Sequence, residues 1–328
     1  MQQIAGLGVR AMRAMRASGS VCRRCLARAF TQSSVRSALG SAPPPNPAPS
    51  GIATLSTRRL LTISGPDAAR FLQGAITASV VRGSDHQPRR DGFYAAFLTA
   101  QGRVLYDVFV YPDTLGAAGP DAKPGDSFLI EVGAAEAEGL QKHIKKYKLR
   151  AKFDTRVLDQ GELSVWHAWD EDLAGVTSCS RGRYSSNMDF MGAIDWHKGC
   201  YVGQELTIRT RHRGVVRKRI LPCVFEDGPG MNALAADMIP TETSIGRVGR
   251  KGRSAGKWIK GVGSVGLALC RLEVMTDITL PGETAASAFV PEDEFVMHFS
   301  SGDEADDRGV RVKAFMPCWL RLGILGHQ

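Results

Sequence analysis

The residues best suited to chemistry lie in one short stretch, D-W-H-K-G-C-Y-V-G-Q-E-L-T-I-R-T at 195–210. Cys200 stands between two glycines, Lys198 precedes it by two positions, and a glutamine–glutamate pair follows. A thiolate is both a nucleophile and a ligand for soft metals, so Cys200 is a candidate for either role. The alternative is a small apolar side chain in a core, because free cysteine is among the most buried residue types.

The residues around Cys200 suggest how it would be positioned. Gly199 and Gly203 permit sharp turns or a close approach of another backbone. Residues 204–211 can form a short helix ended by Gly214. Cys200 would then lie just before a helix N-terminus, where the helix dipole favours a thiolate. His197 and Lys198 would add positive potential.

A second candidate is Asp107, in the strand-like stretch R-V-L-Y-D-V-F-V-Y at 103–111. Alternation places Asp107 on one strand face with Leu105, Phe109 and Tyr111, and the opposite face is apolar too. A carboxylate in such a place is either hydrogen-bonded or faces a cavity. Both readings stay open: a functional acid, or a satisfied strand acid near the end of a hairpin.

The elements that must position these residues follow from periodicity. Strands are expected at 60–64, 93–99, 103–111, 126–132 and 151–158, and helices at 65–74 and 134–147. In the first helix Pro66 is expected in the first turn, Asp67 beside the N-terminus and Gly74 as the stop. The order β-α-β-β-β-α-β predicts an α+β region over 55–214. Short, glycine-broken strands then predict a β-barrel over 215–328.

The first 54 residues have a different composition. Residues 1–50 hold seven arginines and no acidic residue, and residues 4–16 place apolar and basic side chains on opposite helical faces. This pattern is typical of a mitochondrial presequence, followed by a Pro-rich linker at 41–50. Cys22 and Cys25 would be removed with it. Most of the formal charge of +9 therefore belongs to a targeting segment, which weakens a nucleic-acid-binding interpretation.

The stretch K-G-C-Y-V-G-Q-E at 198–205 resembles the signature of the YgfZ branch of the GcvT superfamily, in its mitochondrial form. Other stretches resemble the same family in the same order: I-S-G-P-D-A-A-R-F-L-Q-G (63–74), F-L-T-A-Q-G-R-V-L-Y-D (97–107), G-V-V-R-K-R-I (214–220) and T-S-I-G-R-V-G-R-K-G-R-S-A-G-K-W (243–258). The resemblance covers most of residues 55–328. It implies ferredoxin-like α+β units followed by a C-terminal β-barrel.

The same resemblance implies a function in the mitochondrial matrix. Members of this branch assist maturation of four-iron four-sulfur proteins, so the expected partners are A-type iron–sulfur carriers and client apoproteins, and the chain is expected not to be an enzyme. An iron–sulfur cluster usually takes four ligands, and one well-placed cysteine supplies a single one. Cys200 is therefore expected to be a ligand of a cluster bridged to a partner.

The alternative is a tetrahydrofolate-dependent aminomethyl- or methyltransferase of the GcvT type, with Asp107 as the acid. The resemblance implies a folate or signature-motif site formed by Asp107, Asn187, Asp189, Lys198, Gln204, Glu205 and Arg209. The sequence departs from the family where a P-x-E-x-N run is expected, because Arg183 and Ser185 stand at the proline and glutamate positions. The segment 170–186 is also shorter than the family leads us to expect.

Two basic stretches, 209–219 and 247–260, contain six Lys or Arg residues each. They are either solvated surface or a docking surface for an acidic partner or a polyglutamyl folate tail. Few aromatic residues are interleaved for base stacking, so no nucleic-acid partner is expected. No apolar run approaches the ~18 residues that a membrane helix needs, so no membrane span is expected.

Overall fold

The computed structural model describes residues 50–82, 87–114, 116–119, 122–123, 125–170, 187–226, 236–249, 252–281, 289–300 and 307–326. The predicted presequence, with Cys22 and Cys25, lies outside the described residues, and so does the segment containing Arg183 and Ser185. The described residues up to His212 form one compact unit, and those from Arg213 onward form a second.

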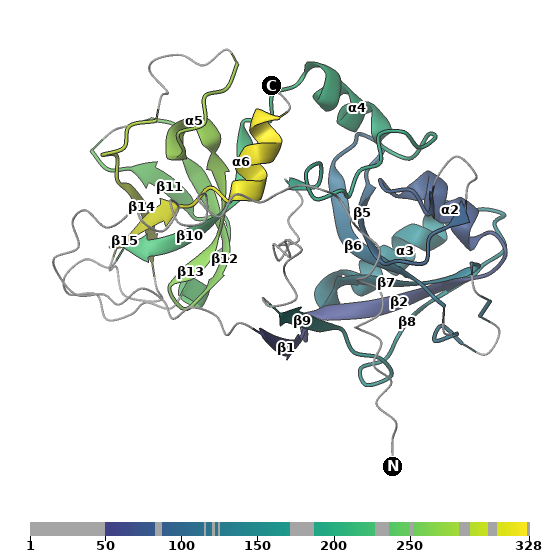
Figure 1. Ribbon diagram of the computed structural model, residues 1–328. Helices are drawn as coiled ribbons and strands as arrows, with labels where there is room; N and C mark the ends of the chain where they lie inside the picture. The colour runs from purple at the N-terminus through teal and green to yellow at the C-terminus, as the bar shows by residue number, and fades with distance from the viewer. Residues whose placement is uncertain are drawn as a thin grey trace. The chain divides into compact units, whose positions relative to one another are not determined.

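The first unit alternates strands and helices much as the periodicity predicts (Figure 1). Its elements are β1 (Ser50–Thr54), β2 (Arg58–Ser64), α2 (Ala68–Ala75), β3 (Val81–Arg82), β4 (Gln87–Pro88), β5 (Phe93–Leu98), β6 (Val104–Pro112), β7 (Ser127–Gly133), the 3-10 helix η1 (Ala134–Glu136), α3 (Ala137–Lys148), β8 (Asp154–Val157), β9 (Trp166–Asp170) and α4 (Gln204–Arg213). The predicted order β-α-β-β-β-α-β is confirmed by β2 to β8, with the short β3–β4 hairpin as an addition.

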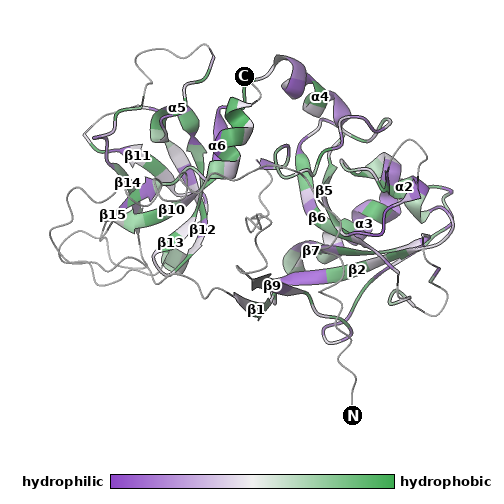
Figure 2. Cartoon of the chain, viewed as in Figure 1, coloured by the Kyte–Doolittle hydropathy of each residue, from purple (hydrophilic) through white to green (hydrophobic). Residues whose placement is uncertain are grey.

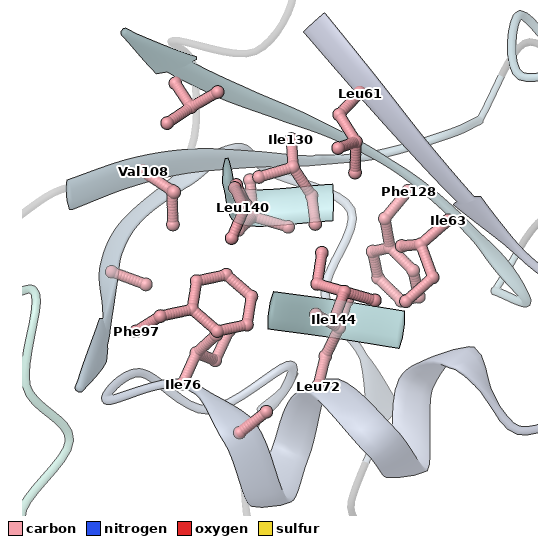
Figure 3. Close-up of a cluster of buried hydrophobic side chains, with 14 of the residues drawn as sticks. Leu61, Ile63, Leu72, Ile76, Phe97, Val108, Phe128, Ile130, Leu140 and Ile144 are labelled. Atoms are coloured by element: carbon pink, nitrogen blue, oxygen red, sulfur yellow. The ribbon is translucent and has the colours of Figure 1, made fainter. Parts of the chain in front are cut away.

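Five strands form one antiparallel sheet in the order β5-β6-β7-β2-β8. Helices α2 and α3 pack on one face of it, and Figure 3 shows Leu72 of α2 and Ile144 of α3 among side chains from the strands. The alternation predicted for residues 103–111 holds, because Val108 and Val110 belong to this core while Asp107 points to the opposite face. Each large aliphatic side chain buried there contributes about 1.5–3 kcal/mol.

Helix α2 corrects two details of the prediction. It ends at Ala75, so Gly74 lies inside the helix, and Pro66 precedes the N-cap residue Asp67 instead of lying in the first turn. Burial of Ala68, Leu72 and Ala75 explains why the helix continues past Gly74, because this burial outweighs the ~1 kcal/mol that glycine costs in a helix interior. The Asp67 carboxylate accepts a hydrogen bond from the backbone N–H of Lys152, at 2.7 Å, and makes no side-chain cap on α2.

The second unit is built around the predicted barrel, which is closed by six strands in the order β10-β13-β12-β11-β14-β15. Its elements are β10 (Lys218–Glu226), the 3-10 helix η4 (Ala236–Met238), β11 (Ser244–Arg247), β12 (Gly256–Val262), β13 (Val265–Arg271), α5 (Leu272–Met275), β14 (Phe295–Ser300), β15 (Asp307–Ala314) and α6 (Cys318–Leu325). Helix α6 is coloured mainly hydrophobic in Figure 2, and its Leu320 and Ile324 are buried.

The barrel interior is filled by side chains around Trp258, which is fully buried. Its ring lies 5.4 Å from that of Phe225, centroid to centroid. A Cβ atom at Gly266 would collide with the indole, and one at Gly261 would lie 2.6 Å from it, so both glycines make room for the ring. In the described part of the chain, no helix is long and apolar enough to cross a membrane.

Candidate functional site

Cys200 lies on the loop that leads into α4, and its side chain is exposed. The predicted helix is confirmed, since α4 begins at Gln204 and ends at Arg213, next to Gly214. The interpretation of Cys200 as a buried apolar filler is wrong, because its side chain is exposed. An exposed free cysteine runs against the usual preference for burial, so the way the loop holds it matters.

Two glycines bring the loop against the β5–β6 hairpin. Gly203 has a φ of +80°, and a Cβ there would collide with the carbonyl oxygen of Thr99 and lie 2.8 Å from the Cβ of Leu98. Gly102 has a φ of +83°, and a Cβ there would collide with Leu206 of α4. The close approach predicted for Gly203 is therefore confirmed. Gly199 has open space around it and no positive φ, so its position does not require glycine.

Lys198 holds the loop on its other side. Its Nζ donates to the carbonyl oxygens of Ile76, at 2.7 Å, and Ala78, at 2.8 Å, about 120 residues earlier in the chain. Burial lowers the pKa of Lys198 to about 8, against an opposing contribution from Asp195. The ammonium group also lies 5.1 Å from the Tyr201 ring centroid. Its described contacts are thus with the protein backbone and Tyr201.

The segment from Ile76 to Ala78 receives further contacts from the residues before Cys200. The buried Thr77 hydroxyl donates to the carbonyl oxygen of Ala193, at 2.7 Å, and accepts from the backbone N–H of Ala96 of β5. The backbone N–H of Asp195 donates to the carbonyl oxygen of Thr77, at 3.0 Å. These bonds tie the loop to the edge of the sheet, so Cys200 is exposed on a backbone that is held from both sides.

The glutamine and glutamate of the signature have different surroundings. The side-chain oxygen of Gln204 accepts from the backbone N–H of Tyr201, at 3.2 Å, and so closes the turn before α4. Glu205 and Arg209 are exposed on α4, which is coloured mainly hydrophilic in Figure 2. A glutamate in the first turn of a helix is stabilised by the helix dipole. Gln204 therefore shapes the loop, whereas Glu205 and Arg209 are exposed on the helix surface.

Asn187 and Asp189 lie further upstream in the same segment. Asn187 is buried, and its backbone carbonyl accepts from the N–H of Met191, at 3.0 Å. The carboxylate of Asp189 accepts from the N–H of Phe190, at 3.0 Å. Both residues therefore shape the turns that lead to Cys200.

Asp107 belongs to a group of charges that no sequence pattern indicated. Its carboxylate lies 3.9 Å from Nη1 of Arg58, which reaches across β7 from β2, and 26% of its side chain is exposed. The same arginine donates through Nε to the fully buried Glu131 of β7, at 2.8 Å, and the Tyr111 hydroxyl donates to Glu131 at 2.6 Å. Partial burial, and then the charge of Asp107, raises the pKa of Glu136, while Arg58 lowers it.

This group of charges lies on the sheet face opposite the helices. None of the described hydrogen bonds or ion pairs of Asp107 reaches the Cys200 loop. The one sequence signal was Glu131 itself, an acid inside the apolar strand S-F-L-I-E-V.

The basic stretches 209–219 and 247–260 are partly built into the second unit. Arg217 pairs with Glu273 at 2.9 Å, Arg247 with Asp293 at 2.8 Å, and Lys257 with Glu242 at 2.6 Å. Arg219 is buried. Several of these charges thus have acidic partners inside the barrel unit.

Comparison with known proteins gives matches along most of the chain. Residues 217–322 match the family described as the CAF17 C-terminal beta-barrel domain. Two curated relatives are named iron–sulfur cluster assembly factor IBA57 homolog, mitochondrial. The one from Chaetomium globosum is 44% identical over 96% of this chain and 97% of the relative, and the one from Pyricularia oryzae is 46% identical over 94% and 93%.

A solved structure, the glycine cleavage system aminomethyltransferase T from Bartonella henselae, matches with a TM-score of 0.49 and 11% identity, over 83% of this chain and 86% of that one.

The relatives also carry residues that this chain lacks. The alignment with the Chaetomium globosum protein spans 425 positions, whereas this chain has 328 residues. The predicted shortening around 170–186 stays a prediction, because that segment lies largely outside the described residues. With identity of this level along nearly its whole length, the chain belongs to the family of IBA57-type mitochondrial iron–sulfur cluster assembly factors.

Proposed function

We propose that this chain assists iron–sulfur cluster assembly in the mitochondrial matrix as a non-enzymatic factor, with Cys200 as a ligand of a cluster shared with a partner. The observation that carries the proposal is the exposure of Cys200 on a loop held by Gly203, Lys198 and Thr77. Such a loop presents a thiol outward without leaving its backbone free to move. The names of the curated relatives support the same function.

A shared cluster fits the distribution of ligands. Among the described residues, no three His, Cys, Asp or Glu side chains gather where they could hold a metal ion. Cys223 and Cys270 are buried in the barrel, and Cys318 is exposed at the start of α6. Since a cluster usually takes four ligands, the others would come from the partner. We propose an A-type carrier in that role, with four-iron four-sulfur apoproteins as the final clients.

The experiment is anaerobic mixing of the full chain with a cluster-loaded A-type carrier, followed by gel filtration with visible absorbance. Wild type is expected to give a coloured complex, and Cys200→Ser a colourless one. Cys318→Ser is the matched control, because it removes the other exposed thiol of the described residues. A Cys200→Ser complex as coloured as wild type would show that the ligand assignment is wrong.

A second candidate function is the folate-dependent transferase, favoured by the position of Asp107. Its partly exposed carboxylate, held near Arg58, is the group that would contact a pterin. Calorimetric titration with tetrahydrofolate would test this for wild type, Asp107→Asn and the exposed control Asp159→Asn. One-to-one binding that only Asp107→Asn abolishes would favour the transferase. If tetrahydrofolate did not bind wild type, the transferase function would be ruled out.

A further inference from the structure

The first unit has a surface hollow of about 460 Å³ that no sequence motif indicated. It opens where α2, the end of α3 and the Cys200 loop meet. Its lining is Asp67, Arg70, Phe71, Gly74, Ala75, Tyr147, Lys148, Leu149, Arg150, Ala151 and Val202. All of these residues belong to the first unit.

The lining combines aromatic rings with unpaired positive charge. Phe71 and Tyr147 supply the rings, while Arg70 and Arg150 are exposed and have no acidic group within ion-pair distance among the described residues. The one acid of the lining, Asp67, already accepts a hydrogen bond from the Lys152 backbone. An occupant of this hollow would therefore be negatively charged and partly apolar.

Leu149 projects from the rim with 89% of its surface exposed. Its φ of +47° and ψ of −113°, with the Ala151 N–H donating to the Lys148 carbonyl at 2.9 Å, define a type II′ turn. Glycine is the residue that suits this position, so the leucine is held in a strained conformation. A large apolar side chain held outward at such a position is available to contact another molecule.

The hollow adjoins the proposed cluster ligand. The N–H of Val202 donates to the carbonyl oxygen of Gly74, at 3.1 Å, and both residues line the hollow. Cys200 is two residues from Val202, so their Cα atoms lie within about 7 Å of each other. A protein that shares a cluster with Cys200 would therefore reach the hollow as well.

We propose that this hollow docks an acidic segment of the protein that shares the cluster, with an apolar side chain against Phe71 and Tyr147 and carboxylates on Arg70 and Arg150. This inference rests on the proposed function, since it names a second contact of the same partner. In this proposal the hollow sets the affinity for the partner protein, and Cys200 binds the cluster.

The test measures affinity for a cluster-free A-type carrier by fluorescence anisotropy, using the full chain. The double variant Arg70→Glu with Arg150→Glu is expected to weaken binding at least about tenfold and to reduce its dependence on salt. The control is Lys142→Glu with Lys145→Glu, which makes the same change in charge on exposed positions of α3 outside the hollow. We expect the control to change affinity less than about threefold.

Leu149→Gly provides an independent readout. It removes the apolar contact and relieves the turn, so weaker binding should accompany a higher Tm, and loss of folding is not an explanation. Equal effects of the two double variants, or unchanged binding in both Arg70→Glu/Arg150→Glu and Leu149→Gly, would overturn the docking proposal. So would binding of pentaglutamyl folate that depends on Arg70 and Arg150 while carrier binding does not.

The outcomes for the two proposals are separable. Cys200→Ser should leave affinity for the cluster-free carrier within about twofold and abolish colour in the complex, whereas Arg70→Glu with Arg150→Glu should lower affinity with or without cluster. Retained colour in Cys200→Ser would defeat the ligand role and leave the docking measurement interpretable.

Discussion

The Cys200 loop and the barrel interior both contain glycine and cysteine, but these residues have opposite roles in the two places. In the first unit Gly102 and Gly203 let two backbones meet, and the thiol beside them is exposed. In the barrel Gly261 and Gly266 make room for Trp258, and the thiols nearby are buried. A cysteine or a glycine thus signals chemistry only through what surrounds it.

Thiol labelling should give the largest difference between these regions. Cys200 should react freely with iodoacetamide, whereas Cys223 and Cys270 should react at least about 1000-fold more slowly, because they are exposed only when the barrel opens. The Cys223 thiol, and then burial, raises the pKa of Cys270 well above its usual range, so mild alkali should not close the gap. Mass spectrometry of labelled peptides gives the rates, and equal rates would contradict this account.

Trp258→Ala should destabilise the barrel and leave the Cys200 loop unchanged. Removing a fully buried indole leaves a large cavity, and we expect the free energy of unfolding of the barrel to fall by about 3–5 kcal/mol. Urea unfolding followed by circular dichroism measures the loss, and labelling of Cys223 and Cys270 should accelerate in parallel. Labelling of Cys200 should not change. A variant as stable as wild type would show that the barrel does not depend on this side chain.

Gly203→Ala should destabilise the contact between the Cys200 loop and the β5–β6 hairpin. Alanine at a φ of +80° is strained, and its Cβ would collide with the backbone of Thr99, so we expect a loss of about 3 kcal/mol. Gly199→Ala should cost less than about 0.5 kcal/mol, since open space surrounds it. Urea midpoints of the two variants provide the measurement. If both glycines tolerated alanine equally, the close approach to the hairpin would not position Cys200.

Lys198 gives the smallest predicted effect, and it depends on pH. Its folded pKa of about 8 lies below the ordinary value of 10.5, so the charged form is penalised by burial. The contribution to stability is therefore full above the unfolded pKa and is lost as pH falls through about 8. Relative to Lys198→Met, the free energy of unfolding of wild type should rise by about 2 kcal/mol between pH 8 and pH 10, because most of the interval between the two pKa values falls in this window.

The same urea measurements across pH would check the Lys198 prediction. A difference between wild type and Lys198→Met that does not vary with pH would mean that the ammonium is not desolvated. The variant should also loosen the loop, because Ile76 and Ala78 would lose their shared donor.

Local patterns were enough for the five-stranded sheet, its two helices and the barrel class, but they did not indicate the β1–β9 pair or the β3–β4 hairpin. Period-two alternation set the two faces of residues 103–111, and glycine-broken strands indicated the barrel. The prediction that the helix ends at Gly74 was wrong. Glycine disfavours a helix, but burial of Ala68, Leu72 and Ala75 stabilises it more, and a local sequence pattern does not show how much burial each residue gains. The exposure of Cys200 was left open for the same reason, since burial depends on what folds over a residue.

Residue types at short spacing were sufficient to predict the class of protein, the main sheet with its two helices, and the residue most worth testing. The folded structure was needed to show which carbonyls hold Lys198, how Arg58 joins Asp107 to Glu131, and that Arg70 and Arg150 line the same hollow as Val202. Those contacts join positions far apart in the chain. They follow from strand register and from the packing of helices on the sheet, which no local pattern encodes.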